Sequence, residues 1–245
     1  MTDYFFNPTI KPSIIPHRIE GDMAEEFLRE VNAKIDEKYL GNSRLKVLSL
    51  KNVNGVPLVV GSNSLILPVI EMVAPNYRTG RPEDLQRTLN DGDTLSIRGN
   101  NYIDLGVVLD FAGRNHEVAL DFYEQLPKEL KDFDRLPSVV IDYRLKNFDK
   151  GSYQLGLVNT PHTQVRPAKI LAGGDGNFKN ADVSLDNGLP IKLAGGERRL
   201  YTSSQGEQSL DNLGLSSLFL NRSLNLDSND EDLAYSSDYG LVVLF

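Results

Sequence analysis

The chain has 245 residues, of which 40% are hydrophobic and 24% charged, with a formal net charge of −8 and no cysteine. These are values of a globular chain with one large or two small domains. The missing cysteine excludes disulfides, thiolate catalysis and cysteine-ligated metals, and the negative charge disfavours a nucleic-acid partner. Because no apolar run suits a membrane helix and no signal peptide is recognisable, we expect no membrane partner and a soluble protein, cytoplasmic or assembled into a particle.

Residues 1–20 are predicted to form an extended N-terminal arm. Pro8, Pro12 and Pro16 recur every four residues, and proline fixes φ and lacks a backbone donor. A lone arm would fray in water, so we expect it to pack on its own domain or on a neighbouring subunit, and the pattern leaves both open. The candidate partner-binding side chains of the arm are Phe5, Phe6, Ile10, Ile14 and Ile15.

An amphipathic helix is predicted from Met23 to Tyr39. Asp22 is its expected cap, and Gly41 follows as a stop. Phe27, Val31 and Ile35 recur every four residues and mark the face that covers a core.

Short apolar runs separated by turn residues follow the helix and predict strands. Asn54-Gly55 between two runs is typical of a tight hairpin. The expected strand segments are 45–50, 56–60, 65–72, 94–97 and 102–111.

Three segments share the pattern Val, apolar, aliphatic, Asp, aromatic: 107–111, 118–122 and 139–143. The first and third are predicted strands with their Asp on the opposite face from the Val. The second fits a strand or a helix over residues 116–126 with Asn115 as cap, and we favour the helix. Residues 128–135 are expected to add one or two helical turns.

Beyond residue 150 the chain becomes richer in glycine. Residues 169–175 and 191–197 resemble each other and are predicted to be two strands ending in glycine turns. The expected fold is a β-rich α+β fold with short-stranded antiparallel sheets, sandwich or barrel-like, and one or two amphipathic helices. We divide it into the arm (1–20), an α+β domain (21–150) and a β-rich domain (151–245), with one single domain as the alternative.

Few patterns suggest chemistry. His17, His116 and His162 are scattered, and the glycine cluster at 173–178 lacks the residues of a phosphate loop, so we expect a turn there. Oxygen ligands at alternate positions from Asp227 give the stretch 227–238 the spacing of a calcium loop, but its sixth position is not glycine, so an exposed acidic loop is favoured.

A hydrolase would need two carboxylates about 5 to 10 Å apart. Asp110, Asp121 and Asp142 would meet this condition if their segments shared one sheet face. Outward aspartates on a half-exposed sheet are the simpler interpretation.

The C-terminal part contains a second candidate binding surface. Residues 221–239 are rich in Asn, Ser, Asp and Tyr, which suits a contact loop that displays Tyr235 and Tyr239 as well as an ordinary polar loop. The apolar run 240–245 must be buried in its own sheet or paired with a partner.

The leading functional hypothesis is a non-enzymatic structural or adaptor subunit that binds other protein subunits, in a homo- or hetero-oligomer such as a virus or phage particle or a tail-like machine. The first alternative is a module that presents residues 221–239 to a glycan or protein, and the second is a carboxylate hydrolase. No cofactor or metal is predicted.

Overall fold

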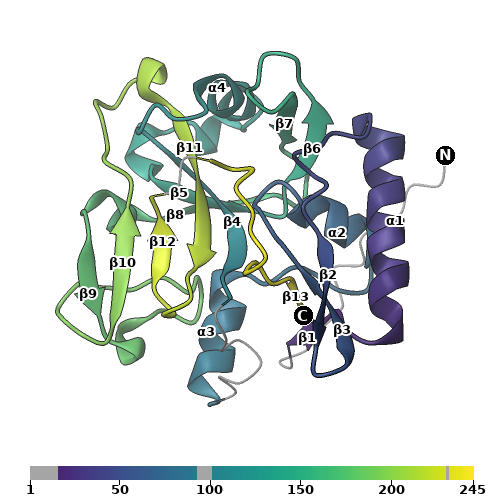
Figure 1. The fold of residues 1–245 in the computed structure, drawn as a ribbon. Coiled ribbons are helices and arrows are strands. Elements are labelled where there is room, and N and C mark those ends of the chain that lie inside the picture. The colour runs from purple at the N-terminus through teal and green to yellow at the C-terminus, as the bar shows by residue number, and fades with distance from the viewer. Residues whose placement is uncertain (1–15, 93–100, 230–231) are drawn as a thin grey trace.

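The computed structural model describes residues 16–92, 101–229 and 232–245, and it confirms a β-rich α+β fold (Figure 1). Within these residues one sheet has seven strands and three others have two. Pairing in the large sheet is antiparallel except between β10 and β12, which are parallel. Its strands lie in the order β8 (Gln164–Pro167), β5 (Ser138–Ile141), β4 (Ile103–Asp110), β11 (Gly214–Leu220), β12 (Leu226–Ser228), β10 (Arg198–Thr202) and β9 (Gly176–Phe178).

This sheet takes strands from both sides of residue 150. The proposed division at that position stays a prediction. Residues 1–15 of the predicted arm lie outside the described residues. Figure 1 shows α1 and the hairpin β2–β3 on one side of the sheet's central strands and β9 and β10 on the other.

Helix α1 (Asp22–Tyr39) agrees with the predicted helix to within one residue. Val31 and Ile35 are fully buried and Phe27 packs partly against the same core. The cap differs from the expectation: Gly21 is the N-cap, with φ 72°, and Asp22 is the first helical residue.

The hairpin of β2 (Ser49–Val53) and β3 (Val56–Val60) confirms the turn at Asn54-Gly55. Both turn residues have positive φ, 54° and 86°, as the tight hairpin turn requires. The part of the prediction over residues 65–72 was wrong, because α2 (Leu67–Val73) occupies it. A short helix buried on all sides has the same apolar run as a buried strand, so the period does not distinguish them.

Helix α3 (Pro82–Asn90) was not predicted. Pro82 at its start followed by Glu83 and Asp84 is a helix-start signal that the sequence contains. The strand expected at 94–97 lies outside the described residues.

Every residue of β4 is buried, because both faces of this strand are covered. Val107 and Leu109 point into the core beneath α1, α2 and α4, whereas Ile103 and Leu105 point into the core on the opposite face. The change of side coincides with an irregularity in the β4–β11 pairing at Gly106. Gly106 has φ 134°, and a Cβ there would lie 2.6 Å from the carbonyl oxygen of Val140. The bulge therefore requires glycine.

The helix favoured over residues 116–126 is confirmed as α4 (His116–Glu124), with Asn115 at the N-cap position. The Asn115 side chain does not cap the helix; its amide donates to the carbonyl of Leu215. The expected helical turns are the 3₁₀ segments η1 (Lys128–Leu130) and η2 (Phe133–Arg135). The strand expected at 139–143 is confirmed over residues 139–141 by β5, which ends before Asp142, where φ is 58°.

The expected pair of glycine-ended strands was wrong. Residues Lys169–Ala172 form the 3₁₀ segment η3, and the resembling residues 191–194 are irregular. The remaining elements of this half are β6 (Arg144–Asn147), β7 (Leu155–Val158), η4 (Asn180–Asp182) and η5 (Leu210–Asn212), of which β6 and β7 form a separate pair.

The C-terminal run is buried in the body of its own chain. β13 (Val243–Leu244) pairs antiparallel with β1 (His17–Arg18), and Leu241 bridges Val60 of β3. The backbone of Phe245 exchanges hydrogen bonds with that of Arg78. All residues from 241 to 245 are buried, so this segment is part of the core.

Replacing Leu241, which is 1% exposed, with Ala should lower the free energy of unfolding by about 2 to 5 kcal/mol, because a buried methyl cluster is lost and a cavity is left. Urea denaturation measures this change. The matched Ile191→Ala variant, at a side chain that is 68% exposed, should change it by less than about 0.5 kcal/mol. Equal effects of the two changes would contradict the burial of the C-terminal segment.

Candidate functional site

The three aspartates considered for hydrolysis do not share a sheet face. Asp121 lies on α4, whereas Asp110 ends β4 and Asp142 follows β5. Since Val107 pairs with Val140 in the antiparallel register, Asp110 and Asp142 lie at opposite ends of the strand pair, about 17 Å apart along it. This separation exceeds the range for paired carboxylates, so Asp110 and Asp142 do not form the pair that the hydrolase alternative would need.

Each of these aspartates has separate partners. Asp110 is fully buried, not outward as expected, and accepts hydrogen bonds from the hydroxyls of Ser203 and Ser216 at 2.7 and 3.1 Å. Asp121 pairs with Lys146 at 2.7 Å. These contacts hold local structure together.

The proposed calcium stretch also lacks a ligand cluster among the described residues. Asp227 Oδ1 accepts the backbone N–H of Asn229, and Asp232 Oδ1 accepts the hydroxyl of Tyr153. Asp230 and Glu231 lie outside the described residues. Over residues 16–92, 101–229 and 232–245, no three His, Asp or Glu side chains are grouped to hold a metal ion.

The three histidines lie on separate elements. His17 stacks edge-on against Tyr77 with 5.6 Å between ring centroids, and His116 Nδ1 lies 3.0 Å from the carbonyl oxygen of Leu213. His162 is exposed in the turn between β7 and β8. Residues 173–175 of the glycine cluster form a bend before β9, with φ 80° at Gly174, and residues 176–178 are β9 itself.

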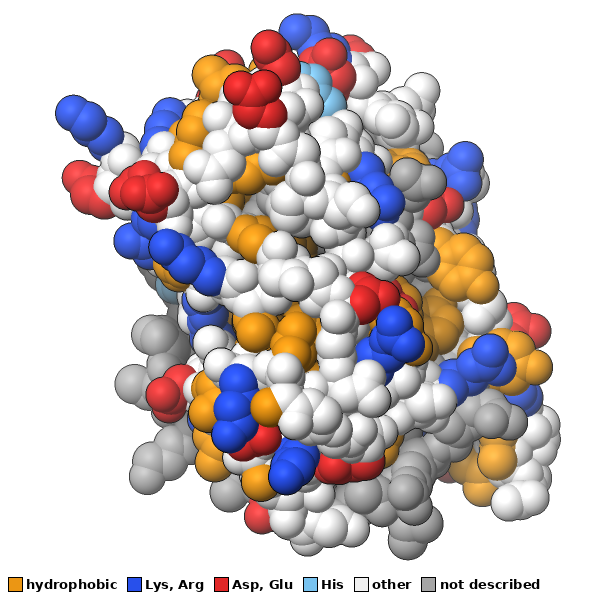
Figure 2. Space-filling view, turned by 90° about the vertical axis from the view of Figure 1, so that its left-hand side faces the viewer, with side chains coloured by type: hydrophobic (Ala, Val, Ile, Leu, Met, Phe, Trp, Pro, Cys, Tyr) orange, Lys and Arg blue, Asp and Glu red, His pale blue; other side chains and the backbone are white. Residues whose placement is uncertain are grey.

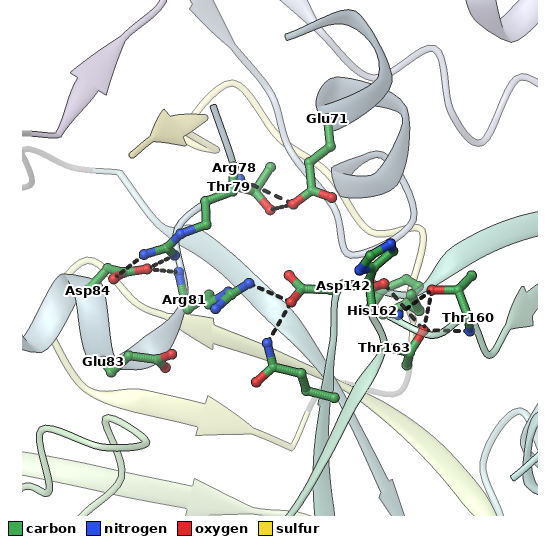
Figure 3. Close-up of polar contacts among 12 residues, drawn as sticks. Glu71, Arg78, Thr79, Arg81, Glu83, Asp84, Asp142, Thr160, His162 and Thr163 are labelled. Carbon is green, nitrogen blue, oxygen red and sulfur yellow. Dashed lines mark hydrogen bonds and ion pairs between the residues drawn. The ribbon is translucent and has the colours of Figure 1, made fainter. Parts of the chain in front are cut away.

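A network of paired charges surrounds the N-terminus of α3 (Figure 3). The guanidinium of Arg78 donates to both carboxylate oxygens of Asp84, one of them at 2.7 Å. Asp84 also accepts the backbone N–H of Arg81, which caps the helix. Burial alone would lower the pKa of Arg78, but the hydrogen bonds and charge of Asp84 outweigh it and raise that pKa.

The same network continues to the sheet. Arg81 pairs with Asp142, which also accepts from the Gln164 amide at 2.9 Å. Arg166 of β8 pairs with Glu83 at 2.9 Å. Glu71 of α2 pairs with Arg144 at 2.8 Å and accepts the Thr79 hydroxyl at 2.9 Å.

Four carboxylates thus face four guanidinium groups, and Arg87 adds a fifth at 3.6 Å from Asp84. Glu71, Glu83 and Asp84 have side chains only 4 to 6% exposed and already bound to arginine. Such carboxylates are poorly placed to take a proton from a substrate, which must reach them. The arrangement is suited to fixing α2, α3 and the loop between them onto the sheet. The sequence gives no local sign of it, because the pairs join residues as far as 83 positions apart.

Replacing Asp84 with Asn should lower the free energy of unfolding by about 3 to 5 kcal/mol, because Arg78, only 12% exposed, would keep its charge without its carboxylate partner. The control is Glu26→Gln, which breaks the exposed Glu26–Arg29 pair and should cost less than about 1 kcal/mol. Chemical denaturation compares the two variants. A loss of stability in Asp84→Asn as small as that in Glu26→Gln would show that the network does not stabilise the fold.

Residues 221–239 are not one loop. They contain β12, which lies inside the large sheet, and Leu233 and Ala234 are buried. The polar sequence of β12, Leu-Asp-Ser, gives little strand signal. Tyr235 and Tyr239 are 54% and 44% exposed, and Lys51 and Arg222 each lie within 6 Å of the Tyr239 ring centroid. The structure therefore places both tyrosines on the surface.

A buried tyrosine secures the segment beside them. The Tyr102 hydroxyl donates to the Ser62 carbonyl at 2.9 Å and accepts the backbone N–H of Ser237 at 3.1 Å. Burial raises the pKa of Tyr102 to about 12, and it likewise raises the pKa of Tyr39 to about 12. The folded chain therefore favours the neutral form of both side chains.

These shifts predict alkaline destabilisation. An unfolded tyrosine loses its proton near pH 10, while the folded one keeps it to about pH 12, so the stability contribution is complete below pH 10 and is lost as the pH rises between these values. The Tyr39→Phe variant should show a smaller loss, because one titrating group is removed while the ring stays. Urea unfolding at pH values across this window gives the free energy of unfolding of the unchanged chain and of the Tyr39→Phe variant. The same pH dependence in both chains would contradict the shift at Tyr39.

A groove of about 560 Å³ lies next to the point where the described chain begins. β1, one side of α1 and the turn after α2 form its walls, and Leu244 of β13 is also part of them. The half-buried Phe27 and Val73 are apolar lining residues, and the exposed Met23 and Tyr77, 74% and 42% accessible, add apolar surface. Its acidic lining residues, all exposed, are Glu20, Glu26 and Glu30.

Figure 2 shows the left-hand side of Figure 1, where basic, acidic and hydrophobic side chains lie interspersed. Among the helices that the structure describes, none has the length and apolar character to cross a membrane. Comparisons with protein-family models, with curated proteins and with solved structures found no match for this chain.

Proposed function

We propose that this protein is a non-enzymatic structural or adaptor subunit that binds other protein subunits through the surface from which its N-terminal arm emerges. The observation that carries the proposal is the groove beside Pro16, with the exposed Met23 and Tyr77 in its lining. Contiguous exposed apolar surface in a folded protein marks a site of association.

Further apolar side chains are exposed in the elements next to α1. Leu50, Val53 and Val56 of the β2–β3 hairpin are each between 38% and 43% exposed. All five residues of β2 are exposed, and in the described part of the chain β2 pairs with β3 alone. An open strand edge with apolar side chains is a second feature that a neighbouring subunit would cover. That the assembly is a virus or phage particle or a tail-like machine stays a prediction.

The display of Tyr235 and Tyr239 to a glycan or protein is the second candidate function. Their exposure favours it, and tyrosine offers rigid apolar area together with a hydroxyl. The two surfaces are separable by mutation, because the tyrosines are not among the residues that line the groove.

Light scattering of the purified full chain tests the proposed function. We expect a mass above that of one chain, and Tyr235→Ala with Tyr239→Ala should leave this mass unchanged, because these side chains lie outside the proposed surface. A chain that is monomeric both when purified and in an extract of the cells that contain it would refute the assembly function. Loss of association in the tyrosine variant alone would favour the display surface instead.

A further inference from the structure

The amino-acid sequence of the arm alternates between apolar and polar residues. In an extended segment, successive side chains point to opposite sides. From position 6 to position 14 the even-numbered residues are Phe6, Pro8, Ile10, Pro12 and Ile14, and the odd-numbered ones between them are Asn7, Thr9, Lys11 and Ser13. An extended arm would therefore have one apolar side, suited to lying in a groove, and one polar side, suited to facing water.

The dimensions of the groove fit part of this arm. Its lining follows α1 from Glu20 to Glu30, which corresponds to about 15 Å at the rise of a helix. The large apolar side chains of the arm, at positions 6, 10 and 14, recur every four residues, or about 13 Å in extended chain. Two of the three therefore fit the groove at one time.

The length of the arm favours a groove on another copy. His17 is itself a lining residue, so an arm that continued directly into its own groove would place only about the last five residues before Pro16 there. Phe5, Phe6 and Ile10 would remain outside. A reversal that brought them back is disfavoured by the prolines, which hold the residues before them in extended conformations. In another copy of the chain, Phe6 and Ile10 can reach the groove without such a reversal.

Charge also suits this occupant. The groove includes three exposed glutamates, Glu20, Glu26 and Glu30, against one arginine, Arg18. Lys11 is next to Ile10 in the sequence and would lie on the polar side of an extended arm. With Ile10 inserted, Lys11 would point toward the edge of the groove, where carboxylates attract it.

We propose that the groove beside α1 receives the N-terminal arm of a second copy of this chain, with Phe6 and Ile10 inserted. This inference rests on the proposed function and adds the identity of the partner to it. Exchange of an identical segment between copies needs no surface beyond those that one chain already carries.

Mixing two full-length variants tests the exchange. The arm variant carries Phe6→Ser and Ile10→Ser, and the groove variant carries Met23→Asp and Tyr77→Ser. Each should self-associate at least about tenfold more weakly than the unchanged chain, because an inserted side chain or its site is lost. A mixture of the two should form one-to-one pairs, because the groove of the first and the arm of the second are intact. Ile191→Asp, at an exposed apolar side chain outside the groove, is the control and should associate normally.

Disulfide trapping distinguishes exchange from docking within one chain, and the absence of native cysteine makes every disulfide an introduced one. Asn7→Cys lies on the polar side of the arm, and Met23→Cys lies in the groove. When the two single variants are mixed under oxidising conditions, we expect a disulfide-linked pair of chains. When Ile191→Cys replaces Met23→Cys in the mixture, we expect little of the disulfide-linked pair.

The outcomes separate the two proposals. A double variant with both cysteines that forms its disulfide within single chains would overturn the exchange, because the arm would then occupy its own groove. Normal association of both the arm and the groove variants would also overturn it, while the assembly function would stand on another surface. A purified unchanged chain that is monomeric would overturn the exchange, and one that is monomeric in the cell extract as well would remove the assembly function too.

Discussion

The central constraint on this fold is that β4 is apolar on both faces and must be covered on both. The bulge at Gly106 moves the apolar side chains from one face to the other, so that Leu105 and Val107 belong to different cores. Helices α1, α2 and α4 contribute to the first core, while α3 and residues 241, 243 and 245 contribute to the second. The positions of α3 and of the C-terminal segment follow from this need for cover.

Helix α3 carries two carboxylates into this partly buried position, and arginines from two other segments pair with them. Arg78 holds Asp84, and Arg166 reaches Glu83 from β8. Charges out of water cost free energy unless they are paired, so the network makes it possible for a polar helix start to lie against the sheet. The acidic residues in the network are already bound to arginine, which makes them poor candidates for catalysis.

Local signals in the sequence were sufficient for the elements that depend on local physics. Asn54-Gly55 specified its hairpin, and the fourfold spacing of Phe27, Val31 and Ile35 specified α1. Where an element is buried on every side, the spacing of its apolar residues does not distinguish a helix from a strand. For this reason α2 was predicted to be a strand. β12 was missed because it is held by neighbouring strands rather than by its own composition.

The candidate surfaces were only partly predictable. The sequence identified an apolar arm and two surface tyrosines, but it gave no sign of the groove, because its walls come from β1, α1, the turn after α2 and β13. The arginine–carboxylate pairs were equally hidden, since Asp142 and Arg81 are 61 positions apart. Long-range proximity of this kind is a property of the folded chain alone.

The pairing of β1 with β13 joins His17 to Leu244 and thus closes a loop that includes nearly the whole described chain. Closing so long a loop costs chain entropy, so we expect this pairing to form late in folding. A chain that has not reached this step lacks part of the groove wall, since Leu244 is one of its residues. Under the proposed function, only a fully folded chain would offer a complete groove to another subunit. The fold itself would then keep partly folded copies out of the assembly.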